Sequence, residues 1–179
     1  MLKRFPIGKA FQFIEPGPVV LVTTAHKGRL NIMTMTWHMV VDFTPKIACI
    51  IGPWDFTYEA LMATKECVIA VPTVDMISKV IDIGNVSGRD TDKFKMTGLT
   101  PLPAKKVKAP LIAQCLHQIE CRLIDTSLSG EHGLNILQGV EAWSDPKRKI
   151  KRTFHANGDG TFAADGKKMD YRKKMIKLP

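Results

Sequence analysis

Two short segments carry side chains of the kinds that bind a polar ligand. The segment SGRDTDKF, residues 87–94, brings glycine, hydroxyl and charged groups together in what should be a tight loop. The segment NIMTMTWH, residues 31–38, alternates hydroxyls with methionine sulfurs and then reaches an indole. The loop of the first segment suits a polar ligand. In the second segment one face should pack in the core, and the other could contact a ligand.

The chain lacks the motifs of common catalytic sites. No G-x-S-x-G elbow, H-E-x-x-H pair or G-x-x-x-x-G-K-[ST] loop occurs. Residues 158–163 match G-x-G-x-x-A, but only sixteen residues follow them, which is too few for a βαβ unit. The five histidines are scattered without the spacing of metal ligands, so we expect no metal site. This scarcity has a physical reason if a bound cofactor supplies the reactivity.

Taken together, the two segments resemble the N-x-M-T-x-x-W and S-G-x-x-x-D-K-F signatures of flavin reductase-like proteins, the FMN-binding split barrels that include flavoredoxins and archaeal ferric reductases. The resemblance extends from about Gly17 to Gly139, with the motifs in the expected order. It implies a β-rich α+β fold, a split β-barrel with a few short helices, as one domain over residues 1–179. It also implies FMN as the cofactor and a homodimer, with the C-terminal segment from about residue 145 at the interface.

The resemblance further implies an oxidoreductase that passes electrons from NAD(P)H or a protein donor through FMN to a flavin, ferric ion or other acceptor. NAD(P)H would stack on the exposed ring face, so no Rossmann motif is needed. The alternative is a non-enzymatic FMN electron carrier, flavoredoxin-like, that docks to a redox partner protein through its basic tail. A third interpretation is a barrel that binds haem or pyridoxal phosphate, as related split barrels can.

The family pattern also places the cofactor contacts along the chain. The ring and ribityl side falls to residues 31–37, the ring edge to the backbone of the next strand, and the phosphate to a helix start and the glycine loop. These residues are Asn31, Met33, Thr34, Thr36 and Trp37; Ile50, Ile51 and Gly52; and Thr57, Ser87, Gly88, Asp92 and Lys93. No side chain is assigned a catalytic role, because the flavin performs the redox chemistry. His38 is a candidate donor to the flavin or to a substrate carboxylate.

Each assignment has a structural alternative. Thr57 binds phosphate at a helix N-terminus, where free N–H groups and the dipole attract anions, or it only caps the helix. Lys93 is either a phosphate ligand or a solvated partner of Asp90 and Asp92. The methionines of residues 31–37 suit a core as well as a cofactor wall. His38 equally suits a satisfied histidine at a strand end.

One position departs from the family pattern. Many relatives have an arginine or lysine in the loop before the helix, whereas this chain has Trp54-Asp55-Phe56. The phosphate charge would then be balanced by Lys93 or by a residue of another subunit. Trp54 would instead shape the entrance over the ring.

The elements that position these residues follow from hydrophobic periodicity. Runs of β-branched and apolar residues predict strands, and apolar residues three or four apart predict helices. Thr57 should be the N-cap of the first helix, Gly84 should end the second, and Gly139 should mark either a bulge or a close contact with a ligand. The expected strands are residues 18–24, 31–37, 46–52, 67–71, 114–126 and 134–143; the expected helices are 58–63 and 76–83; and residues 100–108 form an extended surface loop.

Composition bounds the class of protein. A chain of 179 residues with 45% hydrophobic side chains can bury one substantial core. The net charge is +9, of which +7 comes from residues 145–179, with eleven Lys or Arg against four Asp. Such a tail attracts anionic partners, but few aromatic rings lie between its charges. This favours a solvated face or a phosphate-attracting rim over nucleic-acid binding.

The four cysteines are widely spaced without a C-x-x-C pair, which favours buried thiols in a reducing compartment. Residues 1–11 carry two early cations but no continuous apolar run of the kind found in signal peptides. No run in the chain reaches transmembrane length. We therefore expect no membrane partner and a cytoplasmic location.

Overall fold

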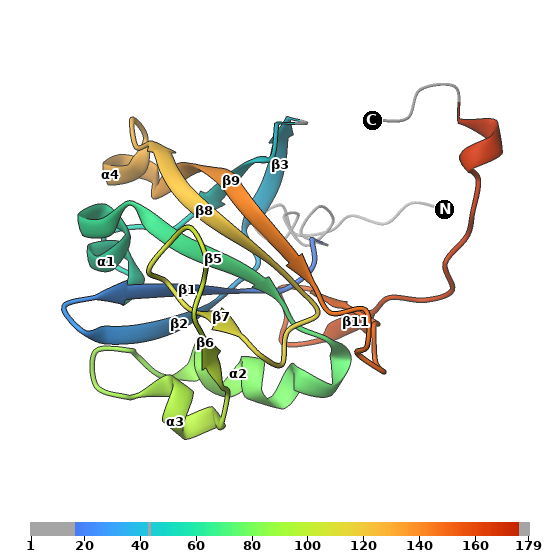
Figure 1. The fold of residues 1–179 in the computed structure, drawn as a ribbon, viewed down its shortest axis with the longest axis horizontal. Helices are drawn as coiled ribbons and strands as arrows, with labels where there is room; N and C mark the ends of the chain where they lie inside the picture. The colour runs from blue at the N-terminus through green and yellow to red at the C-terminus, as the bar shows by residue number, and fades with distance from the viewer. Residues whose placement is uncertain (1–16, 43, 176–179) are drawn as a thin grey trace, which may run out of the picture.

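A seven-stranded antiparallel sheet forms most of the molecule (Figure 1). The computed structural model describes residues 17–42 and 44–175, and the expectation for residues 1–11 lies outside this part. The hydrogen-bonded order of the strands is β2-β1-β5-β8-β9-β4-β3. These strands are β1 (Val20–His26), β2 (Arg29–Met35), β3 (His38–Asp42), β4 (Lys46–Ile50), β5 (Glu66–Val71), β8 (His117–Asp125) and β9 (Leu134–Ser144).

The two edge strands, β2 and β3, are neighbours in the chain, and this curls the sheet. Only Thr36 and Trp37 separate the end of β2 at Met35 from the start of β3 at His38. Three Cα–Cα steps span at most about 11 Å, so the outer edges of the sheet must meet at this end. Within the described residues no strand ladder joins β2 to β3, and the barrel stays open along this seam. The expected split-barrel fold of the β-rich α+β class is confirmed.

Alternate residues of β1 face opposite sides of the sheet and build two cores. Val20 and Val22 pack inside the barrel with buried side chains of β4, β5, β8, β9 and α1 (Phe56–Thr64). Leu21 packs on the outer side, in a cluster that includes Val80 of α2 (Ile77–Asn85) and Phe94 of α3 (Lys93–Thr97). Because both faces are covered, β1 reads as a nearly unbroken apolar run rather than a strict alternation.

The helices are short: α2 and α3 pack on the outer side of the sheet, whereas α1 contributes Leu61 to the core inside the barrel. Figure 1 shows α2 and α3 together beside β2, and α1 at another corner of the sheet. The remaining elements are the 3-10 turns η2 (Val74–Met76) and η3 (Arg172–Lys174), the single turn α4 (Ser129–His132), and two small hairpin sheets made by β6 (Pro101–Leu102) with β7 (Leu111–Ile112) and β10 (Phe154–Ala156) with β11 (Phe162–Ala164). No helix among the described residues has both the length and the hydropathy that crossing a bilayer requires.

All six expected strands and both expected helices are present, with changed ends. The strand expected at 31–37 ends at Met35, because the chain then turns into β3, where His38 pairs with Cys49. The strand expected at 114–126 begins at His117, because the N–H of Cys115 donates to Ile112 in a turn. The G-x-G-x-x-A stretch forms the β10–β11 hairpin, which agrees with its rejection as a dinucleotide fingerprint.

Two helix ends expected from the sequence are wrong. Asp55 is the N-cap of α1, and Thr57 lies in the first turn. The Asp55 carboxylate accepts a hydrogen bond from the N–H of Gly52 (2.9 Å), which fixes the turn that enters the helix. Helix α2 does not stop at Gly84 but runs on to Asn85, since Gly84 does not adopt the left-handed conformation that ends many helices.

The bulge expected at Gly139 is confirmed. Glu120 pairs with Glu141, and the next residue, Cys121, pairs with Gly139, so one residue of β9 has no opposite partner. A Cβ at Gly139 would lie 3.2 Å from the Pro45 side chain, and the Gly139 N–H donates to the Pro45 carbonyl at 2.9 Å. Glycine therefore permits the close approach of β9 to the segment before β4.

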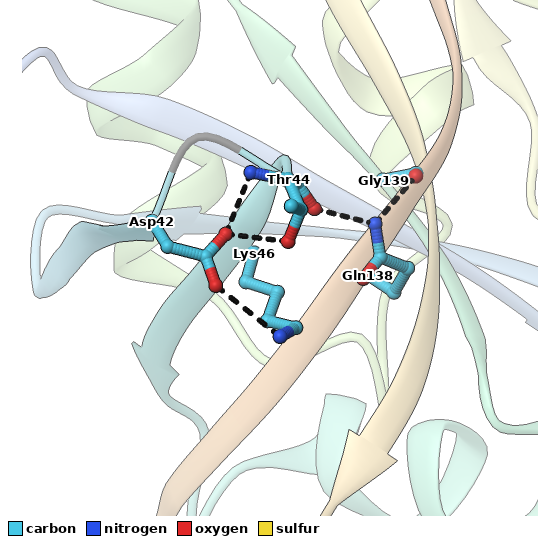
Figure 2. Close-up of polar contacts among 5 residues, drawn as sticks. All are labelled: Asp42, Thr44, Lys46, Gln138 and Gly139. Atoms are coloured by element: carbon cyan, nitrogen blue, oxygen red, sulfur yellow. Dashed lines mark hydrogen bonds and ion pairs between the residues drawn. The ribbon is translucent and has the colours of Figure 1, made fainter.

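The β3–β4 turn is fastened to the same part of β9 (Figure 2). One oxygen of Asp42 accepts from the N–H and the hydroxyl of Thr44, at 2.7 and 2.6 Å, and the other lies 3.2 Å from Lys46. The Gln138 amide donates to the carbonyls of Thr44 (2.7 Å) and Gly139 (3.2 Å). These contacts hold β3, an edge strand, in place beside the seam.

The expected surface loop at 100–108 is tied to the barrel through a buried carboxylate. Glu120 is fully buried, and it accepts hydrogen bonds from the N–H groups of Lys105 (2.9 Å), Lys106 (2.6 Å) and Val107 (3.2 Å) and from the indole of Trp143 (2.7 Å). Burial alone would raise the pKa of Glu120, but these four donors together hold the pKa below its ordinary value. The four cysteines are free and buried, as expected.

We predict that Glu120→Gln lowers the free energy of unfolding by about 2–3 kcal/mol at neutral pH, because amide hydrogens would face backbone N–H donors. The folded-state pKa is depressed, so the contribution of Glu120 is fully present above the unfolded value of 4.5 and is lost as pH falls through the folded value. Urea denaturation across pH 3–7 measures this, and the difference between wild type and variant should shrink in acid. Glu141→Gln, which removes only a surface ion pair with Lys105, is the control; an equal loss in both variants would contradict the prediction.

Candidate functional site

A cleft of about 370 Å³ opens between β2, the start of α1, and the end of α2 with the loop that follows it. We call it the main cleft. It contains residues of both sequence segments, which are more than fifty positions apart in the chain. Its walls are formed by Asn31, Met33, Thr34, Trp54, Asp55, Phe56, Thr57, Ile83, Gly84, Asn85, Val86, Ser87, Gly88 and Lys93.

A second hollow of about 180 Å³ adjoins the main cleft near the seam. We call it the ring hollow. The two share Met33, Thr34, Trp54 and Asp55, so they form one continuous depression along β2. The other walls of the ring hollow are Met35, Thr36, Trp37 and Ile50.

The structure brings together ten of the thirteen residues that the sequence assigned to cofactor binding. Seven line the main cleft and three line only the ring hollow. These are Asn31, Met33, Thr34, Thr57, Ser87, Gly88 and Lys93, and then Thr36, Trp37 and Ile50.

Ile51, Gly52 and Asp92 do not line either hollow. Both backbone groups of Ile51 are already engaged, with Gly133 and with the side chain of Asn135. The Gly52 N–H donates to Asp55, and Asp92 caps α3 by accepting from the N–H of Lys95. These three residues shape the site by holding its walls.

A tight contact joins the two sequence segments. The Asn31 amide donates to the Thr57 hydroxyl at 2.9 Å, while its oxygen, Oδ1, is buried and has no hydrogen-bond partner among the described residues. A Cβ at Gly88 would lie 1.9 Å from that oxygen and 2.8 Å from the Phe56 ring. Only glycine lets the loop after α2 approach β2 and α1 this closely.

Lys93 is buried in the wall of the main cleft rather than solvated. Only 7% of the Lys93 surface is exposed to solvent, and its ammonium group donates a hydrogen bond to the carbonyl of Ile83 at 2.8 Å. Among the described residues no carboxylate pairs with it, so the alternative of a surface partner for Asp90 and Asp92 is not supported. Burial lowers the pKa of Lys93, because the charged form loses its hydration. A buried cation of this kind favours an anionic ligand.

The start of α1 contributes a mixed electrostatic environment. The first N–H groups of an α-helix have no acceptor one turn earlier, although here the Tyr58 N–H donates to the Asp55 carbonyl at 3.0 Å. The Asp55 carboxylate lies at the same end and lines both hollows, so its charge opposes an anion there. Thr57, buried beside Asn31, keeps its hydroxyl in the wall.

Two arginines that were not predicted from the sequence lie next to Phe56, at the start of α1 in the wall of the main cleft. The guanidinium groups of Arg29 and Arg89 lie 5.1 and 5.3 Å from the centre of the Phe56 ring, and Arg29 donates to the Arg89 carbonyl at 2.8 Å. They supply the positive charge that the loop before α1 lacks. Their only sequence signal is their place within turns, which does not reveal that both meet Phe56.

The geometry of His38 favours a structural role over a contact with the flavin or a substrate. A ring nitrogen of His38 lies 2.8 Å from the carbonyl of Pro18, and the side chain lines neither hollow. Trp37 and Trp54 are instead the aromatic side chains at the mouth, 58% and 65% exposed. Trp54 packs closely over Gly52, where a Cβ would lie 2.3 Å from its ring.

Comparison with known proteins gives this geometry a family. Residues 14–160 match the flavin reductase like domain. The chain belongs to that family. An uncharacterized protein of Archaeoglobus fulgidus is 30% identical over 171 residues, which cover 90% of this chain and 96% of the relative.

Solved structures of this flavin reductase-like family have the same fold. An FMN-binding domain of a flavin reductase-like enzyme from Shewanella baltica OS155 superposes with a TM-score of 0.80 at 25% identity, covering 93% of this chain and 95% of that one. The flavoredoxin of Desulfovibrio vulgaris (Miyazaki F) gives 0.79 at 25% identity, covering 87% and 90%. The family expected from the two sequence motifs is confirmed.

We predict that Gly88→Ala destabilises this flavin reductase-like protein by about 1–3 kcal/mol, because the added methyl would displace Asn31 and Phe56. Thermal or urea unfolding of the purified variant measures the loss. Gly84→Ala is the matched control: its Cβ would meet only the Thr34 side chain at ordinary contact distance, 3.7 Å, within α2. That change should raise stability by about 0.5–1 kcal/mol. Equal effects of the two substitutions would show that the Asn31–Gly88 contact does not constrain the loop.

Proposed function

We propose that this chain binds FMN along the main cleft and the ring hollow and acts as an oxidoreductase. It passes electrons from NAD(P)H or a protein donor through FMN to a flavin, ferric ion or other acceptor. The observation that supports this most is the single depression that both family motifs line, with a polar end at Lys93 and an apolar end at the tryptophans. FMN likewise has a charged phosphate at one end and a largely apolar ring system at the other.

The polar end fits a phosphate. Lys93 offers a buried cation that pairs with no carboxylate in the described part of the chain, and Thr57 and Ser87 offer hydroxyls. The close packing of Gly88 against Asn31 brings the backbone of the loop into the wall of the cleft. The buried and unpartnered Oδ1 of Asn31 provides an acceptor that suits the hydroxyls of a ribityl chain.

The other end fits a planar ring. Met33, Met35 and Ile50 give an apolar wall, and Thr34 and Thr36 lie on the same strand segment. Trp37 and Trp54 lie at the mouth, where they would limit the access of water to the ring. When bound, FMN supplies hydride and electron transfer chemistry, and the protein holds and orients it. His38 is not needed for this role, since its ring already meets Pro18.

We also propose a homodimer that completes the pocket beside the seam. Edge strand β3 exposes Met39, Val40 and Val41, with Val40 73% exposed, next to the exposed Trp37. An apolar edge strand of this kind is normally covered in the native assembly. A second copy placed there would lie close to the ring hollow. Sedimentation velocity at micromolar concentration tests this, and a monomer that retains FMN fully would contradict it.

The second candidate function is an electron carrier that docks to a redox partner protein. The high density of positive charge in residues 145–179 favours this carrier function, because it would attract an acidic partner protein to the C-terminal segment. The similar fold of a flavoredoxin supports the same alternative. The four free, buried cysteines suit a reducing compartment, and we propose a cytoplasmic location, which cell fractionation checks.

We predict that Lys93→Met weakens FMN binding by about tenfold or more but leaves riboflavin binding nearly unchanged, because only FMN carries the phosphate. Fluorescence titration of the apoprotein with both flavins measures this. Because burial lowers the pKa of Lys93, wild-type affinity for FMN should fall as pH rises through that pKa, while the variant should not follow. Lys95→Met, an exposed lysine on the same helix, is the control. Equal losses for FMN and riboflavin would remove Lys93 from the phosphate site.

Anaerobic mixing of the flavin-loaded protein with NADH and with NADPH tests the enzymatic function. Loss of the flavin absorbance band on a catalytic time scale with either nucleotide is the expected result. Absence of reduction by both, together with rapid reduction by a redox protein, would favour the carrier. A haem or pyridoxal phosphate spectrum in the purified protein would contradict both proposals.

A further inference from the structure

A third depression, of about 250 Å³, lies beyond the polar end of the main cleft. We call it the side cleft. It shares Asn31 and Phe56 with the main cleft and is otherwise formed by the β1–β2 hairpin and the outer face of α1. Its remaining walls are Thr24, His26, Lys27, Arg29, Glu59 and Ala60. None of these six was assigned a role by the family pattern.

The wall of the side cleft contains a polar group without a structural partner. Thr24 is completely buried, and its hydroxyl forms no hydrogen bond with any described residue. Thr24 lies directly opposite Asn31 in the β1–β2 ladder, so both side chains face the same side of the sheet. The neighbouring Thr23, on the other face, does have a partner and donates to the Pro110 carbonyl at 2.6 Å. A buried hydroxyl that lacks a partner costs stability unless a ligand uses it.

The rest of the side cleft combines an aromatic floor with a positive rim. The Phe56 ring and Ala60 give an apolar surface that suits a planar base. Lys27 and Arg29 lie at the rim, and Glu59, which is 3.9 Å from Lys27, is the one acidic residue among the lining groups. Arg89, on the far side of Phe56, adds another cation. A ligand with a flat heterocycle and a phosphate matches this set.

The position of the side cleft narrows the choice of ligand. It begins where the proposed phosphate site of the main cleft ends, at Asn31 and Phe56. A group joined to the FMN phosphate would therefore enter it, and FAD differs from FMN by an adenosine monophosphate joined at that point. The volume is below the roughly 300–1,000 Å³ of pockets that enclose a whole ligand, so the cleft would hold one base and leave the phosphates at the rim.

We propose that the side cleft binds an adenosine 5′-phosphate group, which belongs to FAD or to NAD(P)H. The Thr24 hydroxyl pairs with the edge of the adenine, which offers both donors and acceptors. Phe56 and Ala60 form the floor, and Lys27 and Arg29 meet the phosphate. This assignment rests on the proposed flavin function only for the identity of the dinucleotide, because the adenosine phosphate site itself is independent of a bound flavin.

Calorimetric titration with 5′-AMP tests the site directly, on both the FMN-loaded protein and the apoprotein. We expect AMP to bind both forms without displacing FMN. Thr24→Val keeps the shape of the side chain and should weaken AMP binding by about tenfold. Thermal stability should not fall, because the removed hydroxyl has no partner among the described residues. Thr23→Val is the matched control, which should lower stability and leave AMP affinity unchanged. Inorganic phosphate at the same concentration controls for charge alone.

The source of the adenosine group is separated by two further measurements on Thr24→Val. Weaker binding of FAD with unchanged binding of FMN assigns the site to FAD. A raised KM for NADH or NADPH, at saturating FMN, assigns it to the nicotinamide dinucleotide. The proposal is overturned if AMP does not bind at millimolar concentration, binds Thr24→Val as well as wild type, or displaces FMN, or if neither dinucleotide is affected. Failure to bind FMN would refute the proposed function. The AMP titration of the apoprotein would still decide whether the side cleft binds an adenosine phosphate.

Discussion

The short connection between the two edge strands is the constraint on which this structure depends. With only Thr36 and Trp37 between β2 and β3, the outer strands of a seven-stranded sheet are forced to meet at one end. The sheet curls, an interior core forms, and a seam remains where no ladder closes it. The ring hollow lies at this seam, lined by the connection itself. In the proposed function, this open edge is where the planar ring of FMN would contact the barrel wall.

A second level of organisation is the approach of the glycine loop to β2 and α1. Gly88 leaves no space for a Cβ beside Asn31, and the Asn31 amide bonds to Thr57. Three elements distant in sequence are thus held around one polar end of the cleft. The groups that cost folding stability lie at the same end of the cleft. They are the Asn31 side-chain oxygen, which has no hydrogen-bond partner among the described residues, and the buried Lys93 cation. Groups that are strained or uncompensated without ligand are those that a phosphorylated ligand would stabilise.

The proposed function assigns the redox chemistry to bound FMN, so it asks the side chains only to bind and orient the cofactor. The polar groups are placed to hold an anion and a polyol, and the aromatic side chains stand at the mouth. Positive charge comes from separate elements: Lys93 of α3, Arg29 of β2 and Arg89 of the loop between α2 and α3. These charges extend past the main cleft to the side cleft, so the same electrostatic arrangement serves both of the proposed ligand groups.

The sequence by itself determined the family, six of the seven strands of the main sheet, and helices α1 and α2, because these depend on local patterns and on two motifs. It did not predict edge strand β3 or helix α3. Ten of the residues that it assigned to cofactor binding line one depression, and it anticipated the bulge at Gly139. The ends of the helices were harder to predict from the sequence. Asp55 is the N-cap of α1 through a contact with Gly52, and Gly84 is helical. Only the tertiary structure decided that Lys93 is buried, that Arg29 and Arg89 share Phe56, and that Thr24 lies unpartnered beside a third cleft. Each of these facts depends on the approach of segments far apart in the chain, and periodicity within a segment does not record which distant segment will cover it.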